Sequence, residues 1–312
     1  MEKKVKSLDD FNNLIDLAIY FKEEKTCLQY LEQWVHKGDI KCPHCGLSNP
    51  YRYKDGKLFA CSQCRVQFTA KVGTVFQNSR LPLVKWFMAL YLFSANKKGV
   101  SAIQLGKAIG VSRKTAWIMG HKIRESVNQN GIVLEGVVQS DETFVGGKNK
   151  NRHIDKKAKY SRNKWRESPD KAPVIGLIDS NGIAKTQVLQ AATLTNIKSV
   201  VMESVKAGST WVTDNYLSVR TLGKYFKREV VNHQKKQFLS KRGHSTNAIE
   251  NLWSHFKRMI IGTYHKVSQK HLQRYCNELT FRFNTRHLKE GERLALLFSK
   301  VNCVIPYKKL IR

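Results

Sequence analysis

The sequence HSTNAIENLWSHFKR, residues 244–258, decides how the second half of the chain is interpreted. Ser245 or Thr246 is suited to cap a helix at this point. The apolar residues that follow recur at helical spacing and predict one buried face: Ile249, Leu252, Trp253 and Phe256. Glu250 and Lys257 lie seven residues apart, two helical turns, so they project from nearly the same side. The stretch alone predicts an amphipathic helix with a solvated polar face. In a basic chain it also suits a carboxylate that binds a metal ion beside a phosphate backbone.

The charge of the chain points to a polyanionic partner. Its 312 residues include 55 Lys and Arg against 24 Asp and Glu, a net charge of +31. Nucleic acid is the first candidate for such a partner, and an anionic membrane surface is the alternative. No lipidation motif and no long uncharged apolar run is present, and the most apolar segment, residues 81–95, contains Lys85 and is too short to span a bilayer. No hydrophobic signal region follows the N-terminus, so a cytoplasmic protein without membrane contact is predicted.

Four of the seven cysteines form two close pairs with the spacing C-x2-C-x15-C-x2-C: Cys42, Cys45, Cys61 and Cys64. Two residues between thiolates let one tight turn direct both sulfurs at a metal, and two such turns complete a tetrahedron. A β-hairpin around Asp55-Gly56 is expected between the pairs, as in a zinc ribbon. Two disulfides are the alternative, which a cytoplasmic setting disfavours. Because all four ligands are cysteines, the zinc is expected to be structural.

A helix-turn-helix is predicted within the helical region that follows, over residues 101–117. Gly110 would make the turn and Ser112 would cap the second helix. That helix would present Arg113, Lys114 and Thr115 to DNA from its first turn. An ordinary helical hairpin is the alternative.

After residue 131 the sequence pattern changes and predicts strands and helices in alternation. Asn181-Gly182 is a strong two-residue hairpin signal between two of the strands. Strands are predicted over residues 133–144, 173–179, 185–192 and 210–214, with helices over residues 194–205, 269–286 and 292–301. This order matches an α/β fold of the RNase H-like type. The predicted domains are an N-terminal helical segment (1–40), a zinc ribbon (41–76), a helix-turn-helix segment (77–130) and the RNase H-like catalytic domain (131–312).

Three acids are placed where they could bind two catalytic metal ions. Asp141 and Asp214 each follow a strand-like apolar run, and Glu250 lies 36 residues after Asp214. Two or three carboxylates suffice for Mg²⁺, which prefers oxygen ligands and keeps several waters. Two such ions are a common means of phosphodiester chemistry. For any single Asp at a strand end, a turn or capping role is the alternative.

The chain resembles bacterial insertion-sequence transposases of the DDE class that have an N-terminal zinc ribbon and an ISXO2-like catalytic domain. The resemblance extends from about residue 27 to residue 286. It rests on these segments: Cys42–Gly46, Asp141–Lys148, Val212–Asp214, Asn247–Lys257, Gly262–His265 and Phe281–Asn284.

The resemblance implies an RNase H-like fold, dependence on Mg²⁺ or Mn²⁺, cleavage at transposon ends and strand transfer into target DNA. Asp141 and Asp214 take the two Asp positions, Glu250 takes the third acidic position, and Lys257 is the basic residue that accompanies it. Asn247 and Asn251 flank Glu250 and are the alternatives for the third position. Asn247 is also expected to orient a ligand or a phosphate.

The expected partners are double-stranded DNA at the terminal repeats and at the target, on the nucleoid. The resemblance also implies a homodimer or a higher oligomer, because two ends must be brought together. The basic tract 148–171, with Lys148, Lys150 and Arg152, is expected to clamp the DNA backbone or to be a solvated loop. Three other functions compete: a DNA-binding regulator with an inactive catalytic domain, a nuclease without strand transfer, and an RNA-binding accessory protein.

Overall fold

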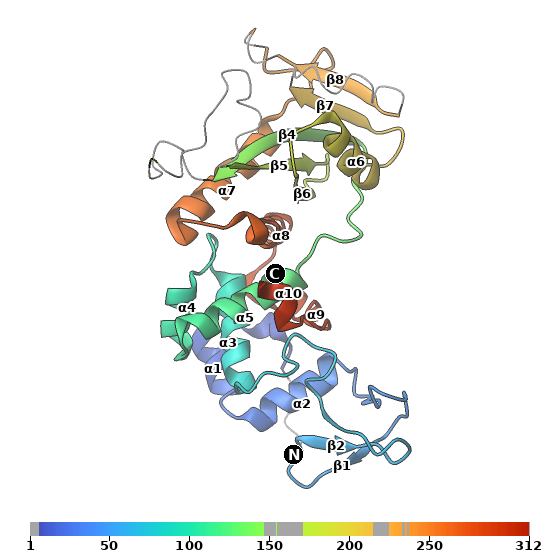
Figure 1. Cartoon of the computed structure of the whole chain (residues 1–312), viewed down its shortest axis with the longest axis vertical. Coiled ribbons are helices and arrows are strands. Elements are labelled where there is room, and N and C mark those ends of the chain that lie inside the picture. Colours follow the sequence, from blue (N-terminus) through green and yellow to red (C-terminus); the bar gives the residue numbers. More distant parts are fainter. Residues whose placement is uncertain are drawn as a thin grey trace. The chain divides into compact units, whose positions relative to one another are not determined.

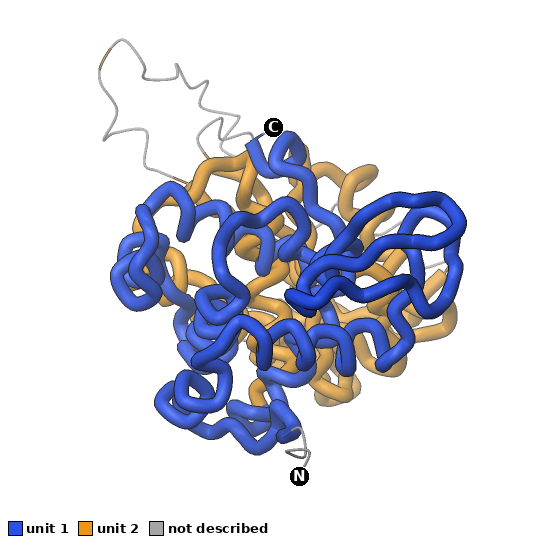
Figure 2. Tube along the Cα trace, turned by 90° about the horizontal axis from the view of Figure 1, so that it is seen from below, with its two compact units in different colours: residues 1–127, 287–312 blue, residues 128–286 orange. Residues whose placement is uncertain are grey.

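The computed structural model describes residues 6–146, 154, 171–214, 225–232, 235 and 237–311. Contacts divide the chain into two compact units (Figure 2), and each is described by itself. Unit 1 comprises residues 1–127 and 287–312, and unit 2 comprises residues 128–286. Residues 287–312 therefore group with unit 1, whereas the sequence assigned them to the domain 131–312.

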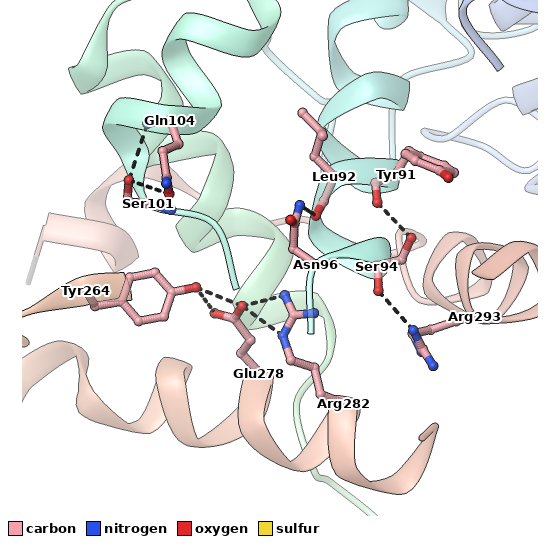
Figure 3. A network of polar contacts seen from close by, with 10 residues as sticks. All are labelled: Tyr91, Leu92, Ser94, Asn96, Ser101, Gln104, Tyr264, Glu278, Arg282 and Arg293. Carbon is pink, nitrogen blue, oxygen red and sulfur yellow. Dashed lines mark hydrogen bonds and ion pairs between the residues drawn. The ribbon is translucent and has the colours of Figure 1, made fainter. Parts of the chain in front are cut away.

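Unit 1 is mainly helical, with the C-terminal helices packed among the N-terminal ones. Its helices are η1 (Leu8–Asp10), α1 (Leu14–Tyr20), α2 (Glu24–Trp34), α3 (Leu83–Ala95), α4 (Ala102–Ile109), α5 (Arg113–Ser126), α9 (Glu290–Ser299) and α10 (Tyr307–Ile311). The ring of Phe298 in α9 lies 4.9 Å from that of Phe87 in α3. Arg293 donates to the backbone carbonyl of Ser94 at 3.3 Å (Figure 3). These contacts bury an apolar face of α9 against α3, which explains why residues 287–312 belong to unit 1. The sequence shows that this face is apolar but does not show which helix covers it.

Over the segment predicted as a helix-turn-helix, the structure has two helices joined by a short turn, α4 and α5. Ser101 and Gln104 form a capping box at the start of α4 (Figure 3). Gly110 ends α4 with φ +63°, a conformation that suits glycine, and Ser112 caps α5 by accepting from the Thr115 N–H. None of the helices in the described part of the chain combines the length and apolar character needed to cross a membrane.

Unit 2 is built on a five-stranded mixed sheet, so the prediction of mixed α/β structure is confirmed. The strands are β4 (Val137–Gly146), β5 (Lys171–Ile178), β6 (Ala184–Val188), β7 (Thr210–Asp214) and β8 (Lys227–Val231). Their order in the sheet is β6-β5-β4-β7-β8. The first three pair as an antiparallel meander, and β4, β7 and β8 pair in parallel. The Asn181-Gly182 turn joins β5 to β6 as predicted, with φ +74° at Gly182.

Helices cover both faces of this sheet (Figure 1). α6 (Leu194–Ser204) packs on one face, in a core with Val138, Ile175, Leu177 and Trp211. α7 (Asn247–Met259) and α8 (Leu272–Asn284) pack on the other face, over Ala172, Val174 and Ile178. The short segments η6 (Ile260–Tyr264), a π-helical turn, and η7 (Gln269–His271) connect α7 to α8.

Amide side chains cover the outer edge of β6, a feature we call the amide ladder (Gln129, Gln273 and Asn284). Asn284 accepts from the Ala184 N–H at 2.7 Å and donates to its carbonyl at 2.9 Å. Gln129 pairs in the same way with Thr186, at 2.6 and 3.0 Å. Gln273 accepts from the Val188 N–H at 2.8 Å. The backbone groups of an edge strand, which usually face water, are therefore satisfied by side chains of the same unit.

Candidate functional site

The four predicted zinc cysteines converge in unit 1. The ligand atoms of Cys42, Cys45, Cys61 and Cys64 all lie within 4.8 Å of one another. The sulfurs of Cys42 and Cys64 are 3.5 Å apart, and those of Cys45 and Cys61 are 3.4 Å apart. A tetrahedron with zinc–sulfur bonds of about 2.3 Å has edges of about 3.8 Å, so this cluster is compatible with Zn²⁺. All four are free thiols, which excludes the alternative of two disulfides.

Each cysteine pair lies in a turn of its own, and the two turns have the same backbone hydrogen bond. The Gly46 N–H donates to the Cys42 carbonyl, and the Arg65 N–H donates to the Cys61 carbonyl, both at 2.9 Å. Gly46 has φ +78° and Arg65 has φ +61°. The strands β1 (Tyr51–Arg52), β2 (Leu58–Ala60) and β3 (Gln67–Thr69) form a small antiparallel sheet that extends from the cluster. These turns direct two sulfurs each toward a common point, as the spacing predicts.

Strand register brings Asp141 and Asp214 to neighbouring positions in unit 2. In the parallel pair β4–β7, Gln139 lies opposite Val212 and Ser140 lies opposite Thr213. The next pair in this register is Asp141 and Asp214. Because side chains alternate along a strand, both carboxylates project from one face, the face that α7 covers. The two acids thus lie side by side where the β4–β7 pairing ends, Asp141 within β4 and Asp214 at the last residue of β7.

The third acid, Glu250, lies in the first turn of α7. The four apolar residues of this helix that were predicted to be buried, Ile249, Leu252, Trp253 and Phe256, are all at most 4% exposed. Thr246 precedes the helix as expected but makes no capping hydrogen bond to it. Instead, the N–H groups of Ala248 and Ile249 donate to the side chain of Gln139, at 3.1 and 3.4 Å. Gln139 belongs to β4, two residues before Asp141, so the start of α7 is tied to the strand that carries the first acid.

The charges of the two other acids act on Asp141. The pKa of Asp141 is raised by its burial, and the negative charges of Asp214 and Glu250 raise it further. Hydrogen bonds from the Glu142 backbone N–H and the Trp253 indole act in the opposite direction. Burial and the charges of Asp141 and Asp214 also raise the pKa of Glu142 to about 7. A divalent cation would relieve this concentration of negative charge.

The carboxylates are nevertheless more widely spaced than the zinc cysteines. Among the described residues, the cysteine cluster is the one set of three or more potential ligands whose donor atoms all lie within 4.8 Å of one another. Like charges favour such separation, and a site for two Mg²⁺ ions roughly 3.5–4 Å apart does not require all carboxylates to touch. The oxygen donors and their shared face suit hard cations such as Mg²⁺ or Mn²⁺.

A second polar cluster holds the segment that leads into α7. Glu229 of β8 accepts hydrogen bonds from the Ser240 hydroxyl and from Nδ1 of His244, the latter at 2.9 Å. The Nε of Arg242 lies 3.6 Å from the other oxygen of the same carboxylate. Glu229 lies opposite Val212 in the β7–β8 pairing, on the face that carries Asp141 and Asp214. The cluster therefore holds the segment that leads into α7 against β8, on the face of the sheet that carries the candidate active site.

The C-terminal end of α7 is anchored to α8 through a buried carboxylate. Glu278 is fully buried and accepts from the Tyr264 hydroxyl at 2.8 Å (Figure 3). It also accepts two hydrogen bonds from the guanidinium of Arg282, at 3.1 and 2.7 Å.

Lys257, in the last turn of α7, is exposed, as are Asn247, Glu250 and Asn251. The polar side of this helix is thus open to solvent.

The residues predicted to contact DNA are only partly covered by the structure. Arg113 and Lys114 are exposed and Thr115 is half-buried, all three in the first turn of α5. A surface hollow lies beside them, lined in part by Ile103, Lys107 and Val111. Lys148, Lys150 and Arg152 lie outside the described residues.

Sequence reasoning did not identify three residues that shape this site. Gln139 caps α7 from β4, Trp253 donates to Asp141, and Gly176 lies opposite Asp141 in the β4–β5 pairing. Two signals were present in the sequence. An isolated glycine inside a strand indicates close approach of another segment, and a buried tryptophan needs an acceptor for its N–H.

Comparison with known proteins gives matches over both units. The model of the ISXO2-like transposase domain matches residues 133–284, and that of the transposase zinc-ribbon domain matches residues 22–67. A Halobacterium salinarum protein, described as an uncharacterized protein in transposable element ISH50, is 28% identical over 231 residues. That alignment covers 70% of this chain and 78% of the relative.

Proposed function

The chain belongs to the insertion-sequence transposases that join a zinc ribbon to an ISXO2-like transposase domain, and we propose that it cleaves the ends of its element and transfers them into target DNA. One observation supports the catalytic assignment. Asp141 and Asp214 occupy adjacent positions on one face of two parallel strands, and Glu250 belongs to the first turn of α7, the helix that packs on that face. The effect of both other acids on the pKa of Asp141 supports their assignment to one site.

In this proposal unit 2 contains an RNase H-like catalytic domain. Its support is the sheet order, an antiparallel meander of three strands followed by two parallel strands, with helices on both faces. The division into a helical segment (1–40), zinc ribbon (41–76), helix-turn-helix segment (77–130) and catalytic domain (131–312) is kept as a functional proposal. The end of the catalytic domain is moved from residue 312 to about residue 286, where unit 2 ends.

The chemistry assigned to the site is hydrolysis of a phosphodiester followed by attack of the freed 3′-hydroxyl on target DNA. Asp141, Asp214 and Glu250 hold Mg²⁺ or Mn²⁺ through carboxylate oxygens. When bound, two such cations activate the attacking oxygen and stabilise the leaving oxygen. Lys257, two turns after Glu250, contacts a phosphate near the scissile bond, and Asn247 orients a ligand or a phosphate from the first turn.

DNA binding is distributed over both units. Arg113, Lys114 and Thr115 project from the start of α5, where a recognition helix meets the major groove. The zinc is structural, since four cysteines leave no open position for a substrate. The net charge of +31 favours backbone contacts over a long DNA segment, including those assigned to Lys148, Lys150 and Arg152. The protein works on nucleoid DNA in the cytoplasm, as at least a dimer, because two ends must be joined to one target.

A strand-transfer assay tests this function. Pre-cleaved duplexes from the ends of the element are incubated with target DNA and Mg²⁺, and wild type is compared with Glu250→Gln. Glu203→Gln is the matched control, because Glu203 is an exposed carboxylate on α6, the helix of the opposite face. We expect joined products from wild type and the control, and at least a 100-fold loss in Glu250→Gln.

Each other outcome has a defined meaning. Cleavage without joined products would indicate a nuclease, and tight binding without metal-dependent chemistry would indicate a regulator. Joined products that persist in Glu250→Gln would move the third ligand to Asn247 or Asn251.

A further inference from the structure

The buried face of α7 carries one polar atom that is aimed at the candidate active site. Ile249, Leu252 and Phe256 contribute only hydrocarbon to this face. Trp253 is 4% exposed, and its indole Nε1–H donates to Oδ2 of Asp141 at 3.1 Å. An indole nitrogen is a donor only, and it neither titrates nor binds metal ions. The contact is therefore a fixed neutral hydrogen bond to the first acid.

Gly176 determines where this indole lies. It is opposite Asp141 in the antiparallel β4–β5 pairing, so the two residues face the same side of the sheet. A Cβ at Gly176 would lie 2.6 Å from Cζ2 and 2.8 Å from Cη2 of Trp253, and 2.7 Å from Cδ1 of Ile249. The ring thus rests directly on the strand backbone, in a space that only glycine leaves open. This close packing holds the indole beside Asp141.

The charges around Asp141 make such an anchor useful. Asp214 stands next to Asp141 in the β4–β7 register, so the two carboxylates repel each other. A lysine or arginine in the place of Trp253 would offset this repulsion, but its positive charge would compete with a divalent cation for the carboxylate. An N–H dipole stabilises the carboxylate without adding a net charge. It also engages one oxygen, so the second oxygen and the remaining lone pairs stay available for a cation.

We infer that Trp253 is a positioning residue of the metal site, whose N–H fixes Asp141 so that the carboxylate binds a divalent cation through its other oxygen. The inference rests on the proposed function, which assigns Asp141 as a metal ligand. Groups that orient metal ligands typically contribute about 10–100-fold to metal affinity. Loss of the indole N–H is therefore expected to weaken cation binding at least about tenfold.

The test measures Mn²⁺ affinity and does not depend on activity. Free Mn²⁺ is titrated by electron paramagnetic resonance into the zinc-loaded full chain, without DNA. Asp141→Asn gives the background from other sites. Trp253→Phe keeps an aromatic ring but removes the donor, and it is expected to shift the Asp141-dependent binding at least about tenfold to higher Mn²⁺ concentration.

A matched control is available on the opposite face of the sheet. Trp211 is also buried, and its Nε1–H donates to the Ser140 hydroxyl at 2.8 Å, next in sequence to Asp141. Trp211→Phe removes an equivalent hydrogen bond and is expected to leave Mn²⁺ affinity within about twofold of wild type. A general loss of structure would affect both variants. If Trp253→Phe does not fold, a variant with benzothienylalanine at position 253 supplies the same test, because that side chain keeps the shape of the indole and lacks its N–H.

The outcomes separate this inference from the function on which it rests. Wild-type binding in Trp253→Phe, or tighter binding, would overturn the positioning role while leaving the metal site intact. Equal losses in Trp253→Phe and Trp211→Phe would overturn it as well. If Asp141→Asn binds Mn²⁺ as wild type does, the metal assignment itself fails, and the inference fails with it.

Discussion

The close packing of α7 on Gly176 predicts that a single methyl group at this position damages both stability and activity. In Gly176→Ala the new Cβ would meet the indole of Trp253 and the side chain of Ile249 at 2.6–2.8 Å. Ordinary carbon contacts lie at about 3.5–4.0 Å, so α7 must move outward by about 1 Å. Such overpacking costs about 1–3 kcal/mol, and the reduced freedom of the unfolded chain returns about 0.4–1 kcal/mol. The expected net loss of stability is about 1–2 kcal/mol.

The same displacement is expected to reach the chemistry, because Glu250 follows Ile249 directly on α7. A misplacement of about 1 Å can reduce a reaction rate about 100-fold. Two measurements check this: the melting temperature of unit 2 by calorimetry, expected to fall by about 2–8 °C, and the rate of strand transfer. Gly262→Ala is the control, because nothing lies within 4 Å of its added Cβ, and it should retain the stability and rate of wild type.

Two results would refute this reasoning. If Gly176→Ala has the same melting temperature as Gly262→Ala, α7 does not rest on the strand as described. If Gly176→Ala is destabilised but joins DNA at the wild-type rate, the position of α7 does not govern the reaction.

Three further predictions concern other parts of the chain. Cys61→Ser should lose the bound zinc, measured by plasma mass spectrometry, and melt the ribbon while unit 2 keeps its own transition. Burial alone would raise the pKa of Glu229, but hydrogen bonds from Ser240 and His244 outweigh it and hold this pKa below its usual value. The stability that Glu229 contributes is therefore present above about pH 4.5 and decreases as the pH falls below that value, so in urea unfolding the difference between Glu229→Gln and wild type should be larger at pH 7 than at pH 3. The double substitution Arg113→Ala and Lys114→Ala should weaken DNA binding and reduce the slope of log affinity against log salt by about two, measured by fluorescence anisotropy.

The sequence was most informative where short-range patterns determine structure. The cysteine spacing predicts the cluster at Cys42, Cys45, Cys61 and Cys64 because two local turns place all four sulfurs. The hairpin at Asn181-Gly182 and the caps at Ser112 and Gly110 are equally local. The buried face of α7 follows from its period of apolar residues. Each of these features needs only a few neighbouring residues to be specified.

Features that depend on pairing between distant segments were not accessible in this way. A strand period places Asp141 and Asp214 in two strands, but only the β4–β7 register puts them side by side. A helical period shows that Trp253 is buried, but not that its N–H meets Asp141, 112 residues earlier in the chain. Likewise, the sequence predicts a helix over residues 292–301, observed as α9, without naming α3 and η1 as its partners. Periodicity identifies which side of an element is buried, but the segment that covers it depends on the fold of the whole chain.

The amide ladder on β6 determines how far unit 2 can be trimmed. Gln129 is the second residue of the unit, and Asn284 lies two residues before its end. A fragment of residues 128–286 would keep both amides and a closed sheet edge. A fragment of residues 132–282 would retain every strand and yet expose the backbone of two β6 residues, Ala184 and Thr186, to pairing with another molecule. Four residues at each end would therefore separate a soluble fragment from an aggregating one.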